Sequence, residues 1–90
     1  MSVSIRFPAL FADRIDGVSR VEVPATTVKD ALKALDVRFP ALRTLLFRSN
    51  GELNPLIVIF LNDKRLPHKQ LHCSIQAGDE IQIVPAIEGG

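Results

Sequence analysis

Hydrophobic and polar residues alternate with a period of two in three stretches of the chain. The first two are 2–7 (SVSIRF) and 19–23 (SRVEV), and the third is 80–86 (EIQIVPA). Each pattern predicts a half-buried β-strand with its apolar residues on one face. Pro24 is expected to close the second strand, because proline cannot donate a hydrogen bond to a neighbouring strand.

The period changes between residues 26 and 39 (TTVKDALKALDVRF), where apolar residues recur at three- and four-residue spacing. This spacing predicts an amphipathic helix. Either Thr26 or Thr27 can cap its first turn, and Asp30 lies favourably near the positive end of the helix. Pro40 is expected to end the helix.

The middle of the chain carries the most apolar stretch, at 54–63 (NPLIVIFLND). It is preceded by 40–47 (PALRTLLF), which is long enough for one more short helical turn. The stretch 54–63 is apolar at both parities, as expected of a strand that is buried on both faces or that binds a partner with its outer face. Asp63 and Lys64 suit a tight turn into a further short strand.

The order strand, strand, helix, strand, short strand, final strand predicts a β-grasp arrangement, an α+β fold. We expect a mixed sheet of four to five strands with one main helix packed on one face. The other face would stay open, exposing either Ile57, Ile59 and Leu61 or the alternate residues of the same strand. We take Ile57, Ile59 and Leu61 as candidate partner-binding residues. Cover by a loop or by a second copy of the chain is the alternative.

Composition narrows the classes of function. Ninety residues suffice for one domain, and eleven basic against ten acidic side chains argue against nucleic acid as a partner. The longest apolar run, 56–61, is far shorter than the roughly 20 residues of a membrane helix, and the first residues lack the pattern of a signal peptide. A single cysteine, Cys73, can form no internal disulfide. We therefore expect a cytoplasmic protein with no membrane partner.

Several of these segments together resemble one known family. They are the helix opening TTVKDALKAL, the stretch FPALRTLLF followed by NGEL, the strand LIVIFLND, the bend QAGDEI and the final IVPAIEGG. The combination resembles the ThiS/MoaD family of ubiquitin-like sulfur carrier proteins, from about Val3 to Gly90. The resemblance implies a β-grasp domain at 1–85 and a flexible tail at 86–90. The segment 39–53 is longer than in compact thiamine-type carriers and is nearer the molybdopterin-synthase and cysteine-biosynthesis types.

The resemblance implies carrier chemistry rather than catalysis. An activating enzyme would use ATP to adenylate the carboxylate of Gly90, and a sulfur-donor protein would convert it to a thiocarboxylate (1-thioglycine). An acceptor enzyme of molybdopterin or cysteine biosynthesis would then take the sulfur. Ile87, Glu88 and Gly89 would contact the partner on the way into its active site. Glu88 departs from the small residue expected before the glycines.

Physical chemistry is consistent with this role for the tail. The terminal carboxyl, with a pKa of about 3.5, is an anionic nucleophile at neutral pH. Glycine has no Cβ, so Gly89 and Gly90 can pass through a narrow channel. Five residues beyond Pro85 reach at most roughly 17 Å when extended.

Two other functions remain open. A ubiquitin-like modifier would use the same tail to form an amide bond with lysines of target proteins. A β-grasp binding module would carry the glycines incidentally. A metal site at His68, His72 and Cys73 is disfavoured, because the stretch is short and loop-like and has no fourth ligand nearby. We interpret Cys73 as a partly buried, inert thiol.

Overall fold

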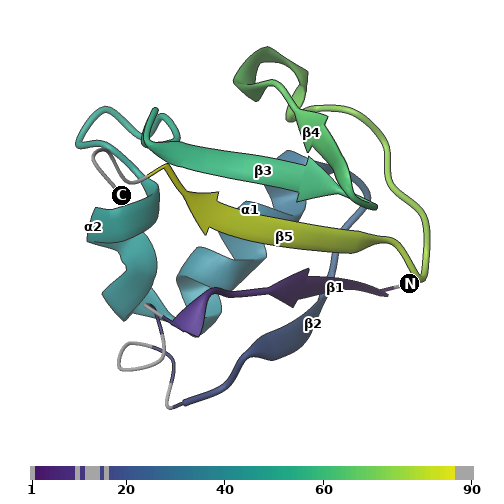
Figure 1. The fold of residues 1–90 in the computed structure, drawn as a ribbon, viewed down its shortest axis with the longest axis horizontal. Coiled ribbons are helices and arrows are strands. Elements are labelled where there is room, and N and C mark those ends of the chain that lie inside the picture. The colour runs from purple at the N-terminus through teal and green to yellow at the C-terminus, as the bar shows by residue number, and fades with distance from the viewer. Residues whose placement is uncertain (1, 10, 12–14, 16, 87–90) are drawn as a thin grey trace.

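The computed structural model describes residues 2–9, 11, 15 and 17–86, and one sheet organises them (Figure 1). The strand order is β2-β1-β5-β3-β4. β1 and β5 are parallel, and the other neighbours are antiparallel. The predicted β-grasp fold is confirmed, with five strands. Their bounds are β1 Ser2–Arg6, β2 Arg20–Pro24, β3 Ile57–Leu61, β4 Lys64–Leu66 and β5 Glu80–Pro85.

The main helix, α1, spans Val28–Arg38 and forms where the apolar spacing predicts it. Of the two candidate caps, Thr27 is the one used: its hydroxyl oxygen accepts a hydrogen bond from the amide of Asp30 at 3.0 Å. The helix ends at Phe39, ahead of Pro40. Its buried stripe faces the sheet and consists of Val28, Ala31, Leu32 and Leu35.

The segment after α1 is helical, as predicted for residues 40–47, but it contains two short helices rather than one further turn. A 3-10 helix spans Pro40–Leu42, and α2 spans Arg43–Leu46. Leu42 and Leu46 are fully buried and anchor these turns in the core. A turn follows at Asn50 and Gly51, with Gly51 at a φ of +88°. A further single-turn 3-10 helix spans His68–Gln70.

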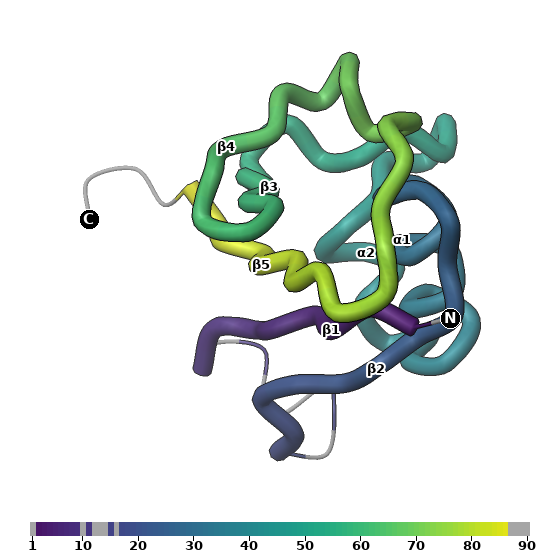
Figure 2. Tube along the Cα trace, turned by 90° about the vertical axis from the view of Figure 1, so that its right-hand side faces the viewer, coloured from purple at the N-terminus to yellow at the C-terminus, as the bar shows by residue number. Residues whose placement is uncertain are grey.

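The core lies between one face of the sheet and the helices (Figure 2). Viewed along the sheet, α1 and α2 lie on the same side of β1, β3 and β5. The alternation in the first, second and last strands predicts their inward faces correctly. The inward residues of the four long strands are all buried: Val3, Ile5, Val21, Val23, Ile57, Ile59, Ile81 and Ile83.

The connection between β3 and β4 lies one residue earlier than predicted. Asn62 and Asp63 form the turn, with φ angles of +51° and +70°, and Lys64 already belongs to β4. Two consecutive residues with positive φ are typical of the tight hairpin turn that matches the twist of the strands. Asparagine and aspartate tolerate this conformation better than lysine does, which explains the position of the turn.

Candidate functional site

The end of β5 positions the predicted reactive tail. β5 is the central strand of the sheet, between β1 and β3, so both of its edges are hydrogen-bonded. Pro85 pairs with Ile57, and the amide of Ala86 donates to the carbonyl of Leu56 at 2.6 Å. The chain is therefore held by backbone pairing up to Ala86. The predicted site residues Ile87, Glu88, Gly89 and Gly90 lie outside the described residues.

The prediction that Ile57, Ile59 and Leu61 of β3 lie on the open face of the sheet is wrong, because these residues face the core. Ile57 is 3% exposed and Ile59 is fully buried, and Leu61 packs against the same core. The cause is the pairing with β5: Ile59 lies opposite Ile83, and paired residues share a face of the sheet. The inner face of β5 thus determines which side of β3 is covered by the helices.

The alternate residues of β3 form the apolar part of the open face. Val58 lies opposite Val84 of β5, and Phe60 lies between Gln82 of β5 and Arg65 of β4. The side chains of Val58, Phe60 and Val84 are half-buried rather than covered. We call these three residues the outer apolar patch. Because Val84 is two residues before Ala86, the patch lies directly beside the root of the tail.

The other half of the open face is polar and charged. Glu80 of β5 lies 3.6 Å from Arg6 and 4.0 Å from Arg20. Arg20 also donates to the hydroxyl of Ser4 at 2.9 Å. These pairs lie on β1, β2 and the first residue of β5, whereas the outer apolar patch lies on β3 and near the end of β5. Such exposed ion pairs contribute little stability, so this half of the face is better suited to orienting a partner than to holding the fold.

A hydrogen-bonded pair at the opposite end of β3 secures its register with β5. Asn62 donates from its amide nitrogen to Asp79 Oδ1 at 3.1 Å, and its Oδ1 accepts from the backbone amide of Glu80 at 2.9 Å. Asp79 Oδ2 accepts from the amide of Gln76 at 2.8 Å. These hydrogen bonds hold the pKa of Asp79 below its usual value. The sequence places Asp79 in the bend 76–81 (QAGDEI) but does not indicate this role.

Two residues of the disfavoured metal site, His68 and Cys73, have other contacts in the structure. His68 Nε2 lies 2.6 Å from the carbonyl oxygen of Ile57, and Cys73 is a half-buried free thiol packed against the core. Within residues 2–9, 11, 15 and 17–86, no group of three or more histidine, cysteine, aspartate or glutamate side chains could hold a metal ion. In the same described residues, no helix has the length and apolar character needed to cross a membrane.

This sheet order, with one main helix on one face, defines the β-grasp class of ubiquitin-like proteins. The model of the ThiS family matches residues 5–90, and the chain belongs to that family of ubiquitin-like sulfur carriers. Carriers of this family are thiocarboxylated at a C-terminal glycine, and they are not catalysts.

Individual relatives support the same grouping. A proposed sulfur carrier protein of Archaeoglobus fulgidus is 28% identical over 91 residues, covering 100% of both chains. The small archaeal modifier protein SAMP1 of Haloferax volcanii is 32% identical, with a TM-score of 0.86 and 100% of both chains covered. The matched chain of the BexX/CysO complex of Amycolatopsis orientalis is 24% identical, with a TM-score of 0.85 over 98% of this chain and 99% of that one. This last likeness concerns the fold.

Proposed function

We propose that this chain carries sulfur on the carboxylate of Gly90 and donates it to a biosynthetic enzyme. The observation that carries the proposal is the family match, which extends through the two glycines to residue 90. The position of Ala86 supports it, because this residue is held by a backbone hydrogen bond to Leu56 and four residues of the given sequence follow it. Four extended residues reach about 13–14 Å, enough to enter a partner's active site while the folded domain stays outside.

The chemistry would proceed in three steps. A Gly90 carboxylate oxygen attacks the α-phosphate of ATP bound by an activating enzyme, pyrophosphate leaves, and an acyl-adenylate forms. A persulfide sulfur of the donor protein then displaces AMP from the carbonyl carbon. A second thiol of the donor releases the thiocarboxylate, and the donor is left as a disulfide. Adenylation is needed because the free carboxylate has no good leaving group.

The outer apolar patch is proposed as the surface that docks on the activating enzyme. Val58, Phe60 and Val84 contribute little to the core, yet they lie beside the root of the tail. Docking there would offset the conformational entropy lost when the tail is ordered. Arg6, Arg20 and Arg65 on the same face would orient an acidic partner surface. The molybdopterin and cysteine pathways are the proposed destinations of the sulfur.

The test is the intact mass of the protein after incubation with its cognate activating enzyme, ATP and a sulfur donor. We expect a gain that corresponds to exchange of one oxygen for sulfur, and no gain when Gly90 is deleted. The matched control is a variant with Ala86→Gly, which keeps the length and the terminal carboxylate. A gain that survives deletion of Gly90 would rule out the proposal.

A second candidate function is conjugation to other proteins, favoured by the likeness to a protein named as an archaeal modifier. In that case the adenylated Gly90 would end in an amide bond with a lysine of a target. Higher-mass conjugates that resist reducing agent in lysate would support it, provided they vanish when Gly90 is deleted. Their absence, together with a thiocarboxylate mass gain, would favour the carrier alone.

A further inference from the structure

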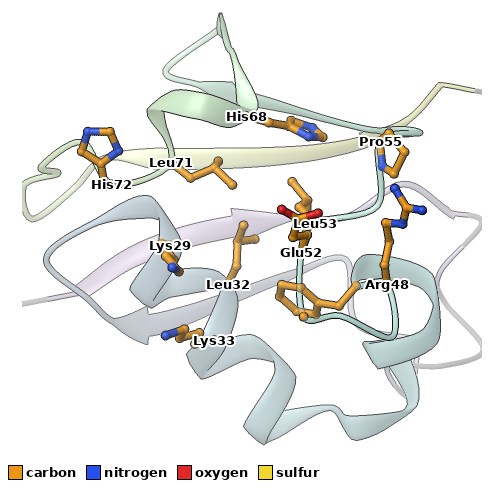
Figure 3. Close-up of a pocket in the computed structure, with 12 residues that line it drawn as sticks. Lys29, Leu32, Lys33, Arg48, Glu52, Leu53, Pro55, His68, Leu71 and His72 are labelled. Carbon is orange, nitrogen blue, oxygen red and sulfur yellow. The ribbon is translucent and has the colours of Figure 1, made fainter.

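A groove on the helix side of the molecule has no part in the proposed sulfur chemistry (Figure 3). It has a volume of ≈ 480 Å³ and lies between α1, the segment 47–55 and the segment 68–72. None of its lining residues belongs to the outer apolar patch. A molecule bound in the groove would therefore leave that patch available to another protein.

One wall of the groove is a hydrogen-bonded turn within the segment 47–55. Phe47 and Leu53 pair across it, and the amide of Arg48 donates to the carbonyl of Glu52 at 2.7 Å. At its base, the Asn54 side-chain amide donates to the carbonyl of Leu45 at 3.1 Å. These hydrogen bonds preorganise the wall, which reduces the entropy lost on binding.

The floor of the groove is apolar. The buried residues Leu32 and Leu53 and the half-buried residues Phe47 and Leu71 line the groove. In Figure 3, Leu32, Leu53 and Leu71 converge from three different segments on the middle of the groove. Such a floor can accept one bulky apolar side chain of a ligand.

The rim of the groove is cationic. Lys29 and Lys33 of α1 and Arg48 of the opposite wall are exposed, and within the described part of the chain none has a carboxylate oxygen within 4.0 Å. Glu52 is the one acidic residue among the described residues that line the groove, and its Oε1 accepts from Asn50 Nδ2 at 3.0 Å. The excess of cations favours an anionic ligand.

A second hollow of ≈ 690 Å³ continues the groove past Phe47. The two hollows share Lys33, Phe47, Arg48 and Gly51. Asp36, on the edge of the second hollow, is already paired with Arg43 at 3.0 Å. Together the hollows exceed the ~300–1,000 Å³ typical of a small-molecule site. An extended chain fits this surface better than a compact metabolite does.

We propose that the groove binds an acidic peptide segment of a partner protein, with one bulky apolar side chain on the floor and flanking carboxylates on Lys29, Lys33 and Arg48. The carrier could then be held by its helix side while the outer apolar patch and tail engage a different enzyme. This proposal does not depend on the chemistry at Gly90. A protein with Gly89 and Gly90 deleted should bind the segment as well as the full chain does.

The experiment follows backbone amide NMR signals of the ¹⁵N-labelled full chain during titration with acetyl-Glu-Asp-Leu-Glu-Asp-amide. We expect shifts centred on Lys29, Arg48 and Leu71, and little change at Val58 or Phe60. Two control peptides separate the contributions: Gln-Asn-Leu-Gln-Asn lacks the charges, and Glu-Asp-Ala-Glu-Asp lacks the anchor. Each should bind at least about tenfold more weakly, because a charge-assisted hydrogen bond or a buried leucine contributes more than 1.4 kcal/mol.

Variants of the chain provide the matched test. The double substitution Lys29→Glu and Lys33→Glu should weaken binding at least about tenfold. The double substitution Arg38→Glu and Lys64→Glu makes the same charge change at residues that line neither hollow, and should not weaken binding. All four side chains are exposed, so the fold should persist, which the dispersion of the amide signals verifies.

Three results would overturn the proposal. They are equal binding of the uncharged peptide, shifts that map to the outer apolar patch, and no shifts at millimolar peptide. A separate arm uses acetyl-Ala-Ile-Glu-Gly-Gly with a free carboxylate, which represents the tail of another copy of the chain. If this peptide bound more tightly than the acidic probe, the groove would be a site for the tail of another copy of the chain. That result would also overturn the proposal that the groove binds a partner protein.

Discussion

The two sides of β3 are both apolar, but one is buried and the other is only partly covered. Ile57 and Ile59 are buried beneath the helices, whereas Val58 and Phe60 point to the open face and are only partly covered by neighbours on the sheet. Burial explains the first pair, because apolar area removed from water stabilises the fold. It does not account for the second pair, whose apolar character we attribute to the proposed docking. The comparison therefore separates residues that maintain the fold from residues that we assign to docking.

The largest effect is expected on the buried side. Ile59→Ala should lower the free energy of unfolding by about 2–5 kcal/mol, because it leaves a cavity beneath Ile83. Urea unfolding followed by circular dichroism measures the change. Ile59→Val is the graded control and should cost about 0.5–1.5 kcal/mol. A loss below 1 kcal/mol for the alanine variant would contradict the burial of this side chain.

Sulfur transfer gives a second measurement on the same variants. Under conditions where Ile59→Val remains folded, thiocarboxylate formation per folded molecule should equal that of the unaltered chain. A buried residue can influence docking only through the fold. If Ile59→Val formed less thiocarboxylate per folded molecule than the unaltered chain, the buried side of β3 would also take part in docking, and this would contradict the proposed division between the two sides.

Much of this fold could be predicted from the sequence, for identifiable physical reasons. Strands that alternate strictly, such as β5, reveal their inward face because burial selects the apolar parity. The helix could be placed because capping by Thr27, the apolar stripe and Pro40 all agree on its bounds. Agreement between such local signals is what makes a prediction dependable.

The faces of β3 could not be predicted in the same way. Both parities are apolar, so the pattern carries no information about which one is inward. The deciding fact is the pairing of Ile59 with Ile83, a long-range register that local periodicity does not encode. The groove was missed for a related reason: Lys29 and Arg48 are distant in the sequence, and only the packing of the 47–55 turn against α1 brings them together.

An intermediate effect is expected on the open side. Phe60→Ala should lower kcat/KM for adenylation by the cognate activating enzyme at least about tenfold, because aromatic anchors dominate binding energy at interfaces. Its effect on the free energy of unfolding should be smaller than that of Ile59→Ala, since the ring is only half-buried. Release of pyrophosphate at subsaturating carrier concentration measures the rate, and urea unfolding measures the stability.

The matched control for Phe60 is Val37, an apolar residue on α1 that is 79% exposed and lies outside the outer apolar patch. Val37→Ala should change neither adenylation nor stability appreciably. Equal loss of adenylation in the two variants would show that exposed apolar area in general matters, rather than the outer apolar patch. An unchanged rate for Phe60→Ala would remove the patch from the docking surface.

The smallest effect concerns the contacts that secure the register of β3. Asp79→Asn should destabilise the fold by about 1 kcal/mol or less at pH 7, because it weakens the hydrogen bonds to Gln76 and Asn62 on an exposed turn. Its matched control is Asp63→Asn, which removes one carboxylate from the neighbouring hairpin turn and should have less effect. Urea unfolding at several pH values compares the two variants.

The pH dependence follows from the direction of the pKa shift. The folded pKa of Asp79 lies below its ordinary value of 3.8, so the stabilisation is complete above that value and is lost as pH falls through the folded pKa. The difference between the unaltered chain and Asp79→Asn should therefore shrink on acidification below pH about 4. A difference that stayed constant would show that the Asp79 charge does not help to hold Asn62 against β5. In that case the pairing of β3 with β5 would determine which side of β3 is buried without help from the Asp79 charge.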